Sequence, residues 1–188
     1  GQYTFCYANI PNITIASTVE TIGQRAFQYS GVEQLIFANE HNSKLKSIGG
    51  YAFEGGSLRS IVLPDNLDFV YTTQYIFYNC KNLKSITVGA KTKVVPQNFI
   101  NGCSALEEIR FQEGLESIYC LNSFYSAIEL GKTNLVTSIT IPSTVKTLVD
   151  GAFGGFENLQ TVIIPANSQL ENIGISAFQN CFALQSIQ

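Results

Sequence analysis

Side chains that commonly perform catalysis or bind metals are scarce in this chain, which has five Cys, a single His and no Met or Trp. His41 lies in the polar stretch NEHNS, which indicates a solvent-exposed loop rather than a metal ligand or a general base. Asp65 and Asp68 lie in PDNLD, a sequence typical of a turn, and a Ca²⁺ site there is the weaker alternative. The sequence contains no hydrolase, zinc-protease or phosphate-binding motif. We therefore expect no enzyme, no catalytic residue, no metal site and no cofactor.

The cysteines show a regular placement but no CxxC pair. Cys80, Cys103 and Cys181 each lie three residues before a Leu that opens an apolar pattern. Because Cys is among the most buried residue types, this register predicts buried free thiols. A disulfide between Cys80 and Cys103 remains an open alternative. Cys6 and Cys120 fall elsewhere in the pattern, and we expect them to be packing residues.

Composition excludes several kinds of partner. The formal net charge is −3, which argues against nucleic acid bound through bulk charge. No apolar run reaches the roughly 18 residues of a transmembrane helix, so we expect no membrane insertion by this segment. The N-terminus has no signal-peptide pattern. Charged residues make up 13% of the chain, so Ser, Thr, Asn and Gln must supply much of its surface.

The elements that position these residues are short and repeat along the chain. One pattern, apolar-x-x-apolar-x-apolar, predicts a strand in each of these ranges: 10–15, 32–37, 58–63, 83–88, 106–111, 136–141 and 159–164, with an eighth beginning at 184. A second pattern alternates with it and ends at Phe5, Phe27, Phe53, Phe77, Ile100, Phe124, Phe153 and Phe178. The period of about 25 residues lies within the range of leucine-rich repeats.

One coil of such a repeat can be described from its pattern. In LKSITV, Leu83, Ile86 and Val88 point inward while Ser85 and Thr87 point outward. Successive strands then pair in parallel, and the Phe residues stack into a spine. The return segments place a second apolar pair inward: Val19/Ile22, Leu45/Ile48, Leu67/Val70, Leu115/Ile118, Val145/Leu148 and Leu170/Ile173.

These patterns predict a leucine-rich-repeat right-handed solenoid. We expect a parallel β-sheet on its concave face, short extended or 3₁₀ return segments on its convex face, and few or no long α-helices. Residues 1–188 form a single array of about seven and a half coils. We expect this array to be a fragment of a longer protein.

The stretches NCKNLKSITV (79–88), SITIPSTVKTLVDGAF (138–153), SKLKSIGGYAF (43–53) and NIGISAFQNCFALQSI (172–187) resemble the BspA-like, or type-5, leucine-rich repeats. The resemblance covers essentially the whole chain. It implies an extracellular or cell-surface protein, similar to adhesins, with a protein or glycan ligand on a host or neighbouring cell. The sequence departs from the family pattern in its long repeats, Phe27–Phe53 and Phe124–Phe153. The second carries an insertion at 126–134, which we expect to protrude.

The outward strand positions supply the candidate binding residues on the concave face. They form three rows along the sheet: Glu33, Gln34, Ile36, Arg59, Val62, Lys84, Thr87, Glu108, Arg110, Thr140 and Ile163. The neighbours Glu33–Arg59 and Lys84–Glu107 have opposite charges, which suits adjacent strands. The alternative is that these rows only solubilise the sheet and neutralise one another.

The leading functional hypothesis is a non-enzymatic protein–protein or protein–glycan interaction module. The alternative is a structural spacer that presents another domain, and a hydrolase has no supporting motif. The first and last coils have no polar cap, so end-to-end self-association through them is a further expectation.

Overall fold

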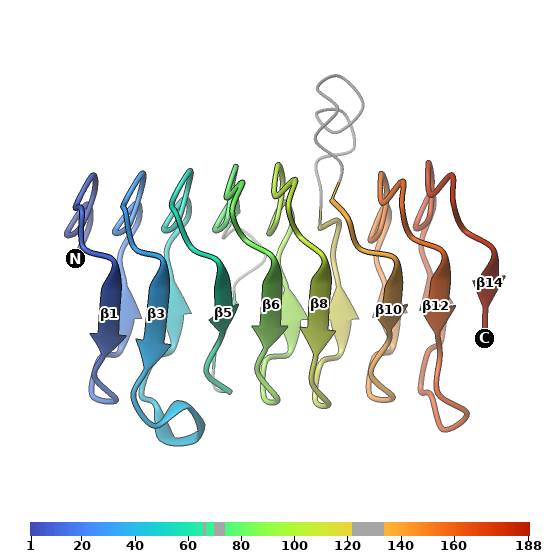
Figure 1. Ribbon diagram of the computed structural model, residues 1–188. Coiled ribbons are helices and arrows are strands. Elements are labelled where there is room, and N and C mark those ends of the chain that lie inside the picture. Colours follow the sequence, from blue (N-terminus) through green and yellow to red (C-terminus); the bar gives the residue numbers. More distant parts are fainter. Residues whose placement is uncertain (66, 70–73, 122–133) are drawn as a thin grey trace.

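The computed structural model describes residues 1–65, 67–69, 74–121 and 134–188. It is a solenoid of about seven turns, in which each turn of chain stacks on the one before it (Figure 1). The expected leucine-rich-repeat solenoid is confirmed. We expected residues 126–134 to protrude, and all of them except Asn134 lie outside the described residues.

One set of strands forms the front of the solenoid in Figure 1, and these strands run parallel. They are β1 (Asn12–Ile15), β3 (Gln34–Phe37), β5 (Ser60–Val62), β6 (Ser85–Val88), β8 (Glu108–Phe111), β10 (Ser138–Thr140), β12 (Thr161–Ile163) and β14 (Ser186–Ile187). The first five are hydrogen-bonded in one sheet and the last three in another. Because the period is regular, equivalent residues pair directly, as Ser85 does with Glu108. We call this side of the solenoid the front sheet.

The return segments are short and extended, as expected, and two-residue strands form at their centres. These are β2 (Thr21–Ile22), β4 (Ser47–Ile48), β7 (Val94–Val95), β9 (Ser117–Ile118), β11 (Thr147–Leu148) and β13 (Asn172–Ile173). They pair in parallel behind the front sheet, since an extended segment presents its N–H and C=O groups to the next coil (Figure 1). The 3₁₀ turn η1 (Glu40–Asn42) lies instead between β3 and β4, at the lower edge in Figure 1. It is the only helix among the described residues, so none of them is long enough to cross a membrane.

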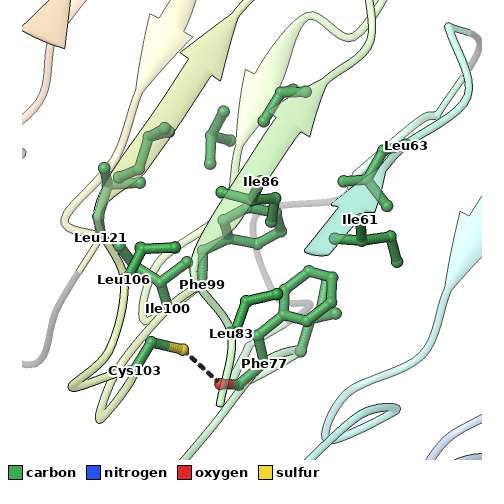
Figure 2. Close-up of a cluster of buried hydrophobic side chains, with 14 of the residues drawn as sticks. Ile61, Leu63, Phe77, Leu83, Ile86, Phe99, Ile100, Cys103, Leu106 and Leu121 are labelled. Carbon is green, nitrogen blue, oxygen red and sulfur yellow. Dashed lines mark hydrogen bonds between the residues drawn. The ribbon is translucent and has the colours of Figure 1, made fainter. Parts of the chain in front are cut away.

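The core lies between the front strands and the return strands. Ile86 and Val88 on β6 are buried, while Ser85 and Thr87 on the same strand are half-buried on the outer side. Figure 2 shows Leu83, Ile86, Leu106 and Phe77 gathered in this interior. The alternation of apolar and polar residues therefore predicts the buried face of β6 correctly.

The phenylalanine spine forms in two sections. Phe5, Phe27, Phe53 and Phe77 stack with ring centroids 5.0, 5.3 and 5.1 Å apart along the first four coils. The next coil has Ile100 in this place, and Phe99 instead meets Phe77 edge-on, with centroids 5.2 Å apart (Figure 2). Stacking resumes between Phe153 and Phe178 at 5.6 Å. Phe124 lies outside the described residues.

The second apolar pair of each return segment points inward in most coils. Leu45 and Ile48 are buried, as are Val145 and Leu148. Val70 lies outside the described residues. Ile173 differs from the prediction, because it is exposed on the last return strand that the structure describes.

The turns that contain the spine Phe form the upper edge in Figure 1, and their backbone is unusual. In most coils, the residues two before and two after the spine position have positive φ, as at Tyr51 (58°) and Gly55 (61°) around Phe53. This geometry lets the N–H groups of Phe53 and Gly55 donate to the carbonyls of Ile76 and Tyr78 in the next coil, at 2.9 and 2.8 Å. The positive φ at these two positions is therefore part of the geometry that forms hydrogen bonds from each coil to the next.

Candidate functional site

All eleven candidate residues lie on or directly before the front strands, and their side chains are exposed or half-buried. The strand register places them in rows that cross the sheet. Gln34 pairs with Ser60, Ser60 with Ser85, and Ser85 with Glu108. We call the eleven residues the sheet surface: Glu33, Gln34, Ile36, Arg59, Val62, Lys84, Thr87, Glu108, Arg110, Thr140 and Ile163. Their role in binding stays a prediction.

Two aliphatic side chains of the sheet surface are adjacent and open to water. Ile36 is 58% exposed and Val62 is 45% exposed. The pairing of Gln34 with Ser60 places them side by side on β3 and β5. Both line a shallow depression together with Gln34. This pair forms the apolar centre of the sheet surface.

A second depression continues along the sheet from Val62. It is lined by further members of the sheet surface, including Thr87, Glu108, Arg110 and Thr140. A third lies beside the start of the strands, and Glu33, Arg59 and Lys84 contribute to it. The structure thus brings ten of the eleven residues into three depressions, two of which share Val62. Ile163 lies farther along, on β12.

The charged residues of the sheet surface are paired with one another. Arg59 contacts Glu33 at 2.9 Å and Lys84 contacts Glu107 at 3.3 Å, which confirms both expected neighbour pairs. Arg110 also donates a hydrogen bond from Nε to Glu108 of its own strand at 2.6 Å. All of these side chains are exposed, so each pair adds little to stability. The residues around the apolar centre are therefore polar, and their charges largely cancel.

The cysteines have a structural role that the sequence only partly indicates. All five are free, so the disulfide alternative for Cys80 and Cys103 is wrong. The thiols of Cys80, Cys103 and Cys181 donate to the carbonyl of the spine Phe in the preceding coil, at 2.9, 3.0 and 3.3 Å (Figure 2 shows Cys103). Burial raises the pKa of Cys103 well above its ordinary value and that of Cys181 to about 11. These thiols are therefore protonated donors rather than nucleophiles.

His41 is exposed, as the sequence predicts, but it is not isolated. Its Nδ1 lies 2.9 Å from Oδ2 of Asp65 in the next coil. This hydrogen bond raises the pKa of His41. Burial tends to raise the pKa of Asp65, but hydrogen bonds from His41 and the Ala90 amide outweigh it and lower that pKa. Asp65 thus accepts hydrogen bonds that tie coils together, a role that its turn sequence does not reveal.

No group of three or more His, Cys, Asp or Glu residues converges within the described part of the chain. The residues that could act as acids or bases are instead spread along the solenoid as exposed pairs.

A row of tyrosines is the feature that the sequence analysis missed. Tyr3, Tyr51 and Tyr75 each lie two residues before a spine Phe, and Arg25 takes that place in the second coil. Arg25 lies over the rings of Tyr3 and Tyr51, 5.9 and 5.3 Å from their centroids, and Tyr51 stacks on Tyr75 at 5.1 Å. Aligning the coils on the spine Phe would have revealed this column.

Comparisons with known proteins agree with the fold. The family model described as BspA type leucine rich repeat region matches residues 1–131 and 131–188, with six copies. No curated protein matches the chain. A leucine-rich repeat protein from Bacteroides ovatus ATCC 8483 is 21% identical, with a TM-score of 0.60 over 95% of this chain and 48% of that one. One from Eubacterium ventriosum ATCC 27560 is 24% identical, with a TM-score of 0.53 over 99% of this chain and 56% of that one.

The chain spans about half the length of these two solved structures, and at such identities the likeness concerns the fold alone. The family assignment rests on the family model, which matches along the whole chain. Proteins of this family are typically surface-associated. The chain belongs to the BspA-type leucine-rich repeat family.

Proposed function

We propose that this chain is a non-enzymatic binding module of a cell-surface or secreted protein, and that its sheet surface docks a protein on a host or neighbouring cell. The observation that carries the proposal is the exposed pair Ile36 and Val62 at the centre of the sheet surface. The surface association typical of the family supports the setting.

The fold does not require aliphatic residues at these two positions. Thr14, Thr87 and Thr140 occupy the same row in other coils. Thr has nearly the shape of Val and the same preference for strands, but its hydroxyl is hydrated at no cost to packing. Ile36 and Val62 therefore expose apolar area that gains free energy only when a partner covers it.

A protein suits this surface better than a glycan does. Sugars stack on the faces of aromatic rings, whereas the outward rows of the front strands carry aliphatic, hydroxyl and charged side chains. An apolar centre surrounded by paired charges is the usual anatomy of a protein–protein interface. The paired charges would set orientation more than affinity.

The test replaces both residues by the Thr found in their neighbours. Beads carrying the wild-type chain or the Ile36→Thr/Val62→Thr variant are mixed with epithelial or bacterial cells, and attachment is counted by flow cytometry. We expect attachment to fall at least tenfold while the thermal midpoint stays within a few degrees of wild type. Ile175→Thr is the matched control, because Ile175 is 78% exposed but lies away from the front strands.

Treatment of the cells identifies the class of partner. Protease treatment should remove attachment, and periodate oxidation of glycans should not. Charge reversal at Arg59 or Arg110 should also weaken attachment, since it places like charges beside Glu33 or Glu108. If the Thr variant attaches as well as wild type while deletion of whole coils impairs the parent protein, the spacer hypothesis replaces this one. Turnover on a substrate panel would instead favour an enzyme.

A further inference from the structure

The turns at the upper edge of the first four coils hold large side chains where the backbone disfavours them. Six residues with positive φ are Tyr or Arg: Tyr3 (53°), Tyr7 (57°), Arg25 (55°), Tyr29 (52°), Tyr51 (58°) and Tyr75 (59°). A side chain with a Cβ is strained in this region, and Gly and Asn tolerate it best. We call these six residues the tyrosine edge (upper edge of the blue to teal coils in Figure 1).

Later coils build the same turn without them. The equivalent positions two before the spine hold Asn98, Gly151 and Ser176. The amide of Asn98 still donates to Cys120 at 2.8 Å and that of Gly151 to Ile175 at 2.9 Å, so the hydrogen bonds between coils persist. The repeat therefore needs the backbone conformation but not the aromatic side chain. Strain that the fold does not require is a reason to look for a function.

Two pairs of rings on the tyrosine edge are stacked on one another. Tyr51 and Tyr75 are stacked at 5.1 Å with 12° between their planes, and Tyr7 and Tyr29 are stacked at 5.4 Å. Tyr29 also covers Gly55, where a Cβ would come within 2.4 Å of the ring. Ordered tyrosines of this kind are well suited to a protein interface, since little side-chain entropy is lost on binding.

Arg25 gives the tyrosine edge a charge preference. Its guanidinium lies between the rings of Tyr3 and Tyr51 and donates to the hydroxyl of Tyr3 at 3.1 Å. Its Nε is buried and has no hydrogen-bond acceptor, and no ion pair involves Arg25 in the described part of the chain. The nearby carboxylate of Glu54 is already held by Gln28 and Tyr29, at 2.6 and 3.0 Å. A carboxylate from outside would pair with the terminal nitrogens of this guanidinium, because the buried Nε is out of its reach.

We propose that the tyrosine edge is a second docking surface, separate from the sheet surface, which binds a protein segment that carries carboxylates between apolar residues. The carboxylate pairs with the terminal nitrogens of Arg25, and the apolar side chains pack against the rings of Tyr3, Tyr51 and Tyr75. Because the whole chain has a net charge of −3, long-range attraction does not drive this association. Short-range contacts at Arg25 and the rings must supply the affinity.

The test is selection of 12-residue peptides from a random display library on the wild-type chain, followed by binding measurements on variants. Tyr51→Asn/Tyr75→Asn copies the residue found at position 98, and Arg25→Asn removes the guanidinium. We expect enriched peptides to be acidic and apolar, and to bind each variant at least tenfold more weakly. The Ile36→Thr/Val62→Thr variant should bind them as wild type does, so this result is independent of the sheet surface.

Stability measurements separate binding from folding. Asn relieves the backbone strain while losing the ring contacts, so the thermal midpoint of Tyr51→Asn/Tyr75→Asn should stay within a few degrees of wild type. A large fall in the midpoint would show that the stack is structural and overturn the proposal. Failure to enrich any peptide, or enriched peptides that bind the variants equally well, would also overturn it. So would binding to a glycan array that the same variants abolish.

Discussion

Truncation of Phe77 tests whether the spine is the main source of stability between coils. Its ring is fully buried, stacked on Phe53 at 5.1 Å with 5° between the planes, and in edge contact with Phe99 at 5.2 Å. Phe77→Ala removes the ring from all these contacts and leaves a cavity in the closely packed interior of Figure 2. Such truncations cost about 3–5 kcal/mol. Since domains are stable by only about 5–15 kcal/mol, this loss is a large part of the total.

The chain provides its own matched variant, because Ile100 occupies the spine position in the fifth coil. Phe77→Ile keeps a branched apolar group in the cavity, so we expect it to cost roughly half as much as Phe77→Ala. Coils contact only their neighbours, so protection from hydrogen exchange should fall first in the coils of Phe53 and Phe99 and least near Phe153.

The assay is urea unfolding followed by circular dichroism, with hydrogen exchange measured on the same samples. The expected order of midpoints is wild type, then Phe77→Ile, then Phe77→Ala, with equal denaturant slopes. A cost below about 1 kcal/mol for Phe77→Ala would refute the reasoning, because burial and stacking together predict several times that value. Equal costs for the two variants would show that cavity size does not determine the loss.

Two further predictions concern titratable groups. In an NMR titration, His41 should have a pKa above its ordinary 6.5, and Asp65→Asn should return it towards that value. The pair should stabilise the fold fully between about pH 4 and about pH 6.5, the ordinary pKa values of Asp and His in the unfolded chain, and this contribution should be lost as the pH falls through the lowered pKa of Asp65 or rises through the raised pKa of His41. An unshifted His41 would show that the contact is absent in solution. In iodoacetamide labelling at pH 8 followed by mass spectrometry, Cys6 should react well before Cys103 and Cys181. The pKa of about 11 at Cys181, against 9.0 ordinarily, reduces its thiolate about a hundredfold, and equal labelling of all three would contradict the burial argument.

The repeat made the fold predictable, because each coil imposes the same demands on its sequence. The spacing of Leu83, Ile86 and Val88 indicates which side of a strand is buried, and the regular period then fixes which strands are neighbours. The ion pairs Arg59–Glu33 and Lys84–Glu107 could be predicted for this reason. The return strands were not predicted as a second sheet, because two-residue strands such as β4 are too short to show an alternation of their own.

Contacts that depend on turn geometry could not be read from the sequence. The hydrogen bond between His41 and Asp65 joins two turns of different length, so their alignment follows from the folded backbone and not from the period. The column of Tyr51 and Tyr75 depends on positive φ, which sequence signals through Gly and Asn but not through Tyr. The exposed residues Ile36 and Val62 were found because strands follow a simple rule of alternation. Features on the regular strands could therefore be predicted from the sequence, and features that depend on irregular turns could not.

Repetition also gives a way to separate residues that build this protein from residues that act for it. Where most coils agree, as in the buried Leu58, Leu83, Leu106 and Leu159 before their front strands, the solenoid itself explains the choice. Where a few adjacent coils depart from the others at some cost, the solenoid does not explain it. Ile36 and Val62 replace Thr on the sheet surface, and the tyrosine edge replaces Asn, Gly and Ser in strained turns. Ile163 lies farther along the same row, but the adjacent pair Ile36 and Val62 and the tyrosine edge both lie in the first four coils. A partner large enough to span an edge and a face of the solenoid would therefore contact the two surfaces together. For such a partner, changing both surfaces should lower the affinity by more than changing the sheet surface or the tyrosine edge alone.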